Sequence, residues 1–425
     1  MPKAIKIKSD NRETDLFSIV IPTRNRPDYL KECLASCVVQ DNAEIVVSDN
    51  SDDDVALTVR QIVDSYAQHN VKYVRPPDAP IGMTPNWNFG LSHATGDYVT
   101  VVGDDDGLLP YCVRTCRELV RTTNAESIRW PWVVYSWPTF FDKAFSDKFS
   151  FDLPQQQRTV GHRMLNGFRE VQAVINNRSW YTSLPMLYNS FVKRSVLESL
   201  SVANGKPLDG QAPDIYSGIA VALSSKHYLS IDYPLSIGGQ GSKANGAAAI
   251  NQAESSLIVS DFKTLNSRAG LFSPLGTVDA GVFACQVTDA FSRFSHRYPS
   301  RARGLSQDPL ILARWQSDEV SRMNLSVTLR NKYKHDLLDF FSPNTRCIAA
   351  IHKAFSENTY VPGSLETGCA TFRVTARASL LGIQGVADAA RILGELLGEP
   401  TMSKPLPSRS RRLVGRLVRL LWRQH

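Results

Sequence analysis

Several features that would place this chain in a particular class of proteins are missing from its sequence. It has no run of about 18 consecutive apolar residues, the length that a membrane-spanning helix requires. Residues 1–15 are polar and lysine-bearing, without the apolar stretch of a signal peptide. The seven cysteines are an odd number without the spacing of a disulfide framework. These absences predict a soluble, cytoplasmic protein with reduced thiols and no spanning helix.

Metal-binding motifs built on cysteine or histidine are also scarce. Cys33 and Cys37, and likewise Cys112 and Cys116, lie four residues apart on expected helices, a spacing open to a four-thiolate metal site. Both pairs fall on apolar helical faces, where cysteine behaves as a small hydrophobic residue. We therefore favour core positions for all four thiols. The histidines are scattered without ligand spacing.

Acidic residues are absent from the end of the chain. Residues 404–425 carry seven basic residues, which equals the net charge of +7, so the rest of the chain is close to neutral. A near-neutral body argues against nucleic-acid binding. The arginines of the tail share one helical face, with leucines and Trp422 around the other. This pattern predicts a basic amphipathic helix suited to an anionic membrane surface, with packing on the body or a partner as the alternative.

The first quarter of the chain alternates between two kinds of hydrophobic pattern. Short β-branched runs predict strands, and apolar residues at helical spacing predict the helices between them. The expected strands are 17–22, 44–48, 71–75 and 98–102. Alternating strands and helices predict an α/β fold with a mostly parallel sheet and right-handed crossovers. In such sheets, ligands bind at the carboxyl ends of the strands.

Polar residues follow three of these strands directly. Thr23 follows the first, Asp49 the second, and Asp104–Asp106 the fourth. Adjacent aspartates repel one another, and a divalent cation that bridges to a diphosphate is a common solution. A solvated acidic turn is the alternative for the aspartates alone. The convergence of three polar clusters at one sheet edge favours a ligand site.

These motifs resemble a known family. The segments FSIVIPTRNRP, VVSDNS and ATGDYVTVVGDDDGLLP, in this order, are similar to the nucleotide-sugar-binding half of family-2 glycosyltransferases, which have the GT-A fold. The resemblance is strong over residues 16–120 and weaker over residues 121–245. The chain departs from the family at two points: Ser48–Ser51 stand where D-D-G-S is typical, and Gly103 holds the first position of the D-x-D-D motif.

The resemblance implies a role for each candidate residue. It implies a divalent cation, Mg²⁺ or Mn²⁺, held by Asp105 and Asp106 against the diphosphate of a nucleotide-sugar donor, with UDP-type donors favoured. The residues expected to contact the donor are Thr23, Asp49, Asp104 and Lys243. Asp214, which opens an apolar helix, matches the position of the family's general base. Helix N-capping is the plainer interpretation of that aspartate, and Asp209 is the competing candidate for the base.

Two further segments leave alternatives open. Gly238, Gly239 and Gly241 predict a mobile or tightly turned loop before Lys243, either a lid beside a diphosphate or a linker. Trp130, Trp132 and Trp137 could stack on sugar rings, although core packing is favoured for at least two of them.

The predicted organisation follows from these patterns and the resemblance. Residues 1–15 form a flexible N-terminus, 16–245 a GT-A catalytic domain, 250–400 an α-helical accessory domain, and 401–425 a linker with the basic tail helix. The predicted function is a metal-dependent inverting glycosyltransferase that acts on a glycan or lipid-linked acceptor in surface polysaccharide synthesis. The alternatives are a nucleotidyltransferase that makes nucleotide sugars and a non-catalytic carbohydrate-binding scaffold.

Overall fold

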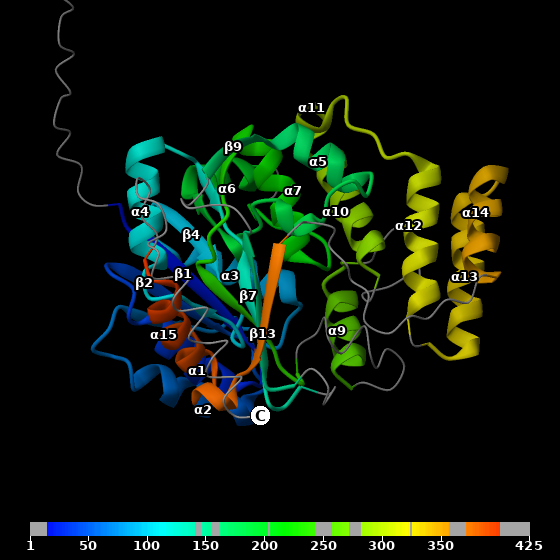
Figure 1. The fold of residues 1–425 in the computed structure, drawn as a ribbon. Coiled ribbons are helices and arrows are strands. Elements are labelled where there is room, and N and C mark those ends of the chain that lie inside the picture. The colour runs from blue at the N-terminus through cyan, green and yellow to red at the C-terminus, as the bar shows by residue number, and fades with distance from the viewer. Residues whose placement is uncertain are drawn as a thin grey trace, which may run out of the picture.

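Two β-sheets with helices packed around them form the fold (Figure 1). The computed structural model describes residues 15–140, 146–154, 162–202, 205–243, 257–271, 282–323, 325–356 and 371–399. The predicted α/β fold with a helical C-terminal region is confirmed. The predicted flexible N-terminus and basic tail lie outside the described residues, apart from Asp15.

The larger sheet has the strand order β3-β2-β1-β4-β10-β6-β11-β9. Its strands are β1 (Phe17–Thr23), β2 (Ala43–Asp49), β3 (Val71–Val74), β4 (Tyr98–Val101), β6 (Ser127–Arg129), β9 (His162–Asn166), β10 (Ser190–Lys193) and β11 (His227–Ile231). The first four strands are parallel, as the sequence predicts, and β10 is antiparallel to β4. The carboxyl ends of β1, β2 and β4 therefore meet at one edge of the sheet.

Helices cover both faces of this sheet. They are α1 (Pro27–Cys37), α2 (Asp53–Asp64), α3 (Met83–Ser92), α4 (Cys112–Thr123), α5 (Gly167–Ile175), α6 (Arg194–Ser201) and α7 (Pro213–Ser225). Ile19 and Ile21 of β1 pack in the core with α1, while Val20 packs in the core with α3 and α7. Every residue of β1 is buried. Two covered faces explain why the strands read as continuous apolar runs.

The smaller sheet has the order β13-β8-β7-β12-β5. Its strands are β5 (Gly107–Leu108), β7 (Trp132–Ser136), β8 (Lys148–Pro154), β12 (Ser236–Gln240) and β13 (Thr371–Arg377). The expected loop at Gly238 and Gly239 is wrong, because both residues lie in β12, which pairs with β7 and β5. These glycines serve close packing rather than mobility.

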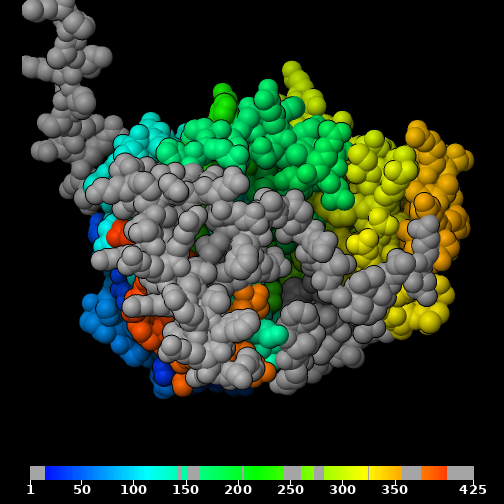
Figure 2. All heavy atoms as spheres, viewed as in Figure 1, coloured from blue at the N-terminus to red at the C-terminus, as the bar shows by residue number. Residues whose placement is uncertain are grey.

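The remaining helices form one side of the molecule, and the later ones among them are yellow to orange in Figure 2. They are α9 (Leu257–Arg268), α10 (Phe283–Arg297), α11 (Pro299–Ala302), α12 (Pro309–Arg322), α13 (Val327–Phe341) and α14 (Thr345–Ser356). Three short 3₁₀ helices are η1 (Tyr181–Ser183), η2 (Leu187–Asn189) and η3 (Ser379–Leu381). Phe294 and other residues of α10 share a core with α7. The helical part is therefore packed onto the α/β part.

Residues 371–399 return from the helical part to the sheets. β13 pairs antiparallel with β8, and α15 (Val386–Leu397) lies beside α1 (Figure 1). The apolar face of α15, with Val386, Ala389 and Leu393, is buried in the same core as α1 and β5. The stretch 250–400 is thus not uniformly helical or separate. The predicted domain boundaries stay predictions.

The two cysteine pairs are core residues. Cys33 and Cys37 of α1 and Cys112 and Cys116 of α4 are all buried, and Cys33 donates to the carbonyl of Gly103 at 3.3 Å. Among the described residues, no group of histidine, cysteine and carboxylate side chains is arranged to hold a metal ion by itself. No helix in the described ranges is long and apolar enough to cross a bilayer.

Candidate active site at the carboxyl edge of the sheet

The three aspartates form a tight turn between β4 and β5. The N–H of Asp106 donates to the carbonyl of Gly103 at 3.0 Å, and the side chains of all three aspartates are buried or nearly so. Each carboxylate has a different environment, although the three residues are adjacent. The turn must therefore be considered one residue at a time.

Asp104 is held by two neighbours from the end of β1. Its Oδ2 accepts from Thr23 Oγ1 at 2.7 Å and from Arg26 Nε at 3.0 Å, while its Oδ1 lies 2.6 Å from Arg26 Nη2. Burial raises the pKa of Asp104 to about 6, because the charge of Arg26 only partly offsets the loss of water and the repulsion from Asp105. Burial alone would lower the pKa of Arg26, but the three aspartates raise it. The predicted neutralisation of the turn is thus supplied in part by an arginine.

Asp106 closes the turn on itself. Its Oδ2 accepts from the N–H of Gly103 at 3.0 Å, and its Oδ1 accepts from the N–H of Gly239 at 2.6 Å. Tyr188 also hydrogen-bonds to this carboxylate, while burial and the charge of Asp105 raise the pKa of Asp106. A Cβ atom on Gly103 would lie 2.4 Å from Asp106 Oδ2. A side chain at position 103 would therefore have to displace the Asp106 carboxylate.

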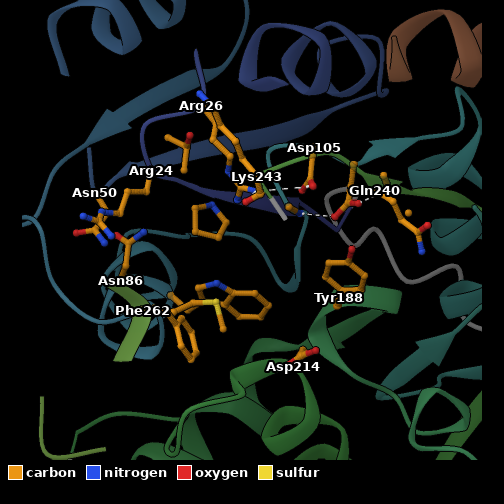
Figure 3. A pocket seen from close by; sticks show the side chains of 18 of the residues that line it. Arg24, Arg26, Asn50, Asn86, Asp105, Tyr188, Asp214, Gln240, Lys243 and Phe262 are labelled. Carbon is orange, nitrogen blue, oxygen red and sulfur yellow. Dashed lines mark hydrogen bonds and ion pairs between the residues drawn. The ribbon is translucent and has the colours of Figure 1, made fainter. Parts of the chain in front are cut away.

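Of the three carboxylates in the turn, that of Asp105 has the fewest contacts, and it lines the cavity. Within the described residues, its carboxylate pairs with Arg26, whose Nη1 lies 3.7 Å from Oδ2. Its backbone carbonyl accepts from Trp137 Nε1 at 3.1 Å, and this bond anchors the turn to the smaller sheet. The backbone of Asp105 is thus anchored, and its side chain lines the cavity (Figure 3).

Asp49 lies at the end of β2 but does not line the cavity. It is fully buried, and its oxygens accept from Tyr73 Oη at 2.8 Å and from the N–H of Ser51 at 2.9 Å. Asn50, the next residue, lines the cavity and clamps the following loop through both the N–H and the carbonyl of Ile81, each at 2.8 Å. Asp49 shapes this end of the cavity from behind Asn50.

The cavity in front of this edge encloses about 710 Å³. Thr23, Arg26, Asp105 and Asp106 line it on the sheet side. The helical part contributes Asp261, Phe262 and Leu265 of α9 and Phe283 of α10. A volume of this size suits a substrate-sized ligand. The helical part therefore completes the cavity.

Asp214 lines the cavity at the first turn of α7. It is not the N-cap residue, because Ala212 holds that position without a side-chain cap bond. Burial raises the pKa of Asp214, against the opposing effect of the Ile215 N–H and its own N–H. Figure 3 shows Asp214 across the cavity from Asp105, with Tyr188 between them. A carboxylate with a raised pKa in this place is suited to accept a proton.

Asp209, the competing candidate, has a structural position. Its Oδ1 accepts from the N–H of Gly210 at 2.7 Å and from Arg293 Nη1 at 3.2 Å. It does not line the cavity. This carboxylate ties the loop before α7 to α10.

Lys243 lines the cavity beside the end of β1. Its ammonium donates to the carbonyl of Asn25 at 3.4 Å, and its carbonyl accepts from Arg26 Nη1 at 3.3 Å. Arg24 lies on the same side and pairs with Asp261 of α9 at 2.5 Å. Three cationic side chains thus border the part of the cavity next to Asp105 (Figure 3).

Two of the three tryptophans lie in the core and one lies at the cavity, as the sequence predicts. Trp130 and Trp137 are buried in the core, whereas Trp132 lines the cavity and contacts Tyr188 edge-to-face at 5.8 Å between ring centroids.

The sequence analysis did not identify Arg26 as a partner of the aspartates or Tyr188 as a wall of the cavity. An arginine directly after a strand beside an acidic turn is a usable signal for the first; Tyr188 carries none.

Of the carboxylates in the turn, Asp105 is the one available to a divalent cation. Asp105 offers an open carboxylate, and Mg²⁺ is commonly bound by one or two carboxylates together with substrate phosphates. The Asp106 carboxylate already accepts two N–H groups and the Tyr188 hydroxyl. The donor set therefore fits a cation that arrives with a diphosphate, with Asp105 as its principal protein ligand.

The comparison with known protein families concerns the first part of the chain. Residues 18–181 match the family described as Glycosyl transferase family 2. The chain carries a family-2 glycosyltransferase domain. The matched residues include nearly all of β1, the strands β2 to β9 and the aspartate turn, whereas Tyr188, Asp214 and Lys243 lie beyond them.

Named relatives match parts of this chain. One is the GalNAc(5)-diNAcBac-PP-undecaprenol beta-1,3-glucosyltransferase of Campylobacter jejuni, 36% identical over 102 residues, which are 23% of this chain and 32% of the relative. Glycosyltransferase GlyA of Streptococcus pneumoniae is 32% identical over 94 residues, 22% of this chain and 13% of the relative. The chain thus spans a third or less of the length of these relatives. The solved structure of S. aureus TarS residues 1–349 with UDP-GlcNAc has a TM-score of 0.43 at 16% identity, covering 84% of this chain and 98% of that one.

Proposed function

We propose that this protein transfers a sugar from a nucleoside-diphosphate sugar to a hydroxyl group of a glycan or lipid-linked acceptor, with inversion at the anomeric carbon. The observation that carries the proposal is the placement of Asp105 and Asp214 on opposite sides of one cavity (Figure 3). The cationic side chains that line the cavity, Arg24, Arg26 and Lys243, lie on the side of Asp105 in Figure 3, with Asp214 on the opposite side. The end of the cavity near Asp105 suits a negatively charged leaving group, and the end near Asp214 suits a base.

The proposed roles follow from these positions. The diphosphate lies beside Asp105, near Arg26 and Lys243, and the nucleoside extends toward Thr23 and Asn50. A bound Mg²⁺ or Mn²⁺ would stabilise the negative charge of the departing diphosphate. Asp104 holds Arg26 at this edge, and Asp106 keeps the turn in shape. Asp49 supports the donor end from behind Asn50 rather than by lining the cavity.

The proposed chemical step is a single displacement. The acceptor hydroxyl attacks the anomeric carbon, its proton passes to Asp214, and the bond to the diphosphate oxygen breaks with its electron pair leaving on the diphosphate. Attack from the side opposite the leaving group inverts the anomeric centre. The raised pKa of Asp214 supports its role, because a base works best when its pKa is near the working pH.

The acceptor is proposed from the tail and from the relatives. The basic, leucine-rich residues 409–425 suit an anionic membrane surface, where a lipid-linked acceptor would be presented. The name of the Campylobacter jejuni relative refers to an undecaprenol-linked glycan. A role in surface polysaccharide synthesis, with peripheral attachment to the inner face of the membrane, follows from this proposal.

The test is release of nucleoside diphosphate from a panel of UDP- and GDP-sugars in the presence of Mn²⁺. We expect one donor to be hydrolysed slowly without acceptor, and the Asp105→Asn variant to lose this activity. A purified chain that binds glycans but hydrolyses and transfers none of the donors would instead be a carbohydrate-binding scaffold.

A further inference from the structure

The guanidinium of Arg26 lies between the carboxylates of Asp104 and Asp105. Its Nη2 lies 2.6 Å from Asp104 Oδ1 and its Nε donates to Asp104 Oδ2 at 3.0 Å, so the guanidinium holds both oxygens of one buried carboxylate. Its Nη1 lies 3.7 Å from Asp105 Oδ2 and donates to the carbonyl of Lys243 at 3.3 Å. A single side chain thus bridges the aspartate turn and the end of the segment after β12.

This arrangement leaves little for a free divalent ion. Both oxygens of Asp106 accept backbone N–H groups, and both oxygens of Asp104 face Arg26. A cation without nucleotide would find the carboxylate of Asp105 and a neighbouring positive charge. Like charges at such short range repel strongly where water is largely excluded.

We propose that Arg26 prevents free divalent cations from binding at the aspartate turn. A cation binds there only when it arrives with a nucleoside diphosphate. The diphosphate supplies acceptor oxygens for the guanidinium, whose planar fork matches phosphate geometry. Arg26 then gains a second set of partners while the cation takes its place at Asp105. This inference rests on the proposed function, and it makes nucleotide and cation binding cooperative.

The experiment measures Mn²⁺ binding to the full chain by isothermal titration calorimetry, first alone and then with UDP or GDP. For the wild type, we expect weak binding of Mn²⁺ alone and a nucleotide-dependent increase of roughly 5–150-fold, the usual range for coupled sites. Arg26→Gln should bind Mn²⁺ alone at least about tenfold more tightly and show a smaller effect of nucleotide. Arg24→Gln is the matched control, because Arg24 lines the same cavity but pairs with Asp52 and Asp261.

The titration with Mn²⁺ alone tests the inference without nucleotide, so its result does not depend on which nucleotide the protein prefers. Equal Mn²⁺ affinity of Arg26→Gln and the wild type, or an equal gain in Arg24→Gln, would overturn it while leaving the transferase proposal intact. Arg26→Lys covers the case in which the glutamine variant does not fold, because its ammonium keeps the charge without holding both oxygens of Asp104. We expect this variant to bind Mn²⁺ alone with intermediate affinity, and wild-type affinity would contradict the proposal.

Discussion

Gly239 is the position where one methyl group should do the most damage to the site. A Cβ atom on this residue would lie 1.7 Å from the carbonyl oxygen of Asp105 and 2.9 Å from Trp137 Nε1. Because real Cβ atoms keep at least about 3.0 Å from such atoms, β12 and the aspartate turn would have to separate by about 1.3 Å. Gly239→Ala therefore tests whether the turn is packed against a strand or faces a loose loop.

Two hydrogen bonds set the size of the effect. The separation would stretch the bond from Trp137 Nε1 to the Asp105 carbonyl, now 3.1 Å, and the bond from the Gly239 N–H to Asp106 Oδ1, now 2.6 Å. Overpacking costs about 1–3 kcal/mol, and a buried polar group left unpaired costs about 1–3 kcal/mol more. We expect a total loss of roughly 2–6 kcal/mol, which for a chain of 425 residues lowers the melting temperature by on the order of 2–7 °C. A displacement near 1 Å should also lower turnover about a hundredfold.

The measurements are thermal unfolding and donor hydrolysis, with Gly238→Ala as the matched control. The Cβ of that variant would meet the indole of Trp132 at 2.9 Å, a side chain on the cavity wall rather than backbone. We expect the control to lose less stability than Gly239→Ala. A Gly239→Ala protein with the melting temperature and turnover of the wild type would refute the reasoning and favour a mobile loop at this position.

Three further predictions concern the base, the cation and the tail. Asp214→Asn should bind donor normally yet lose most transfer, because a base acts only as the acceptor's proton leaves. Since burial raises the pKa of Asp214, wild-type turnover should fall as the pH drops through this raised value, above the range of an ordinary aspartate, and the variant should lack this acidic limb. Asp105→Asn should lower turnover by about a hundredfold or more without lowering the melting temperature, and a chelator should act likewise on the wild type. A chain ending at Ser403 should bind donor but lose affinity for anionic liposomes, whereas the full chain should bind them less tightly as salt rises.

Each of these has its own contrary outcome. Normal transfer by Asp214→Asn together with loss in Asp209→Asn would move the base to Asp209, whose ties to Gly210 and Arg293 instead predict an effect on stability. Full activity in excess chelator would remove the cation from the mechanism. Equal sedimentation of both chain lengths with liposomes would leave the tail as a packing element.

The sequence by itself determined the sheet and the edge where the site lies. Apolar runs such as Phe17–Thr23 and Tyr98–Val101 are buried on both faces, and this local pattern is visible without any tertiary contact. Residues that directly follow parallel strands meet at one edge of the sheet, so the sequence predicts that Thr23 and Asp104 lie close together. In the structure, Thr23 Oγ1 lies 2.7 Å from Asp104 Oδ2. The start of an apolar helix at Asp214 is also a local pattern, and the family resemblance implies the role of this residue as the base.

Only the tertiary structure decided what each carboxylate does and what closes the cavity. Three adjacent aspartates look alike in the sequence, yet Asp104 holds Arg26, Asp106 holds Gly103 and Gly239, and Asp105 stays open. These differences arise from partners that are remote along the chain, such as Gly239, and from the way the turn folds back on itself. The same holds for Phe262 and Phe283, which reach the cavity because α9 and α10 pack beside the α/β part. Side-chain contacts of this kind depend on packing between distant segments, and no local periodicity encodes them.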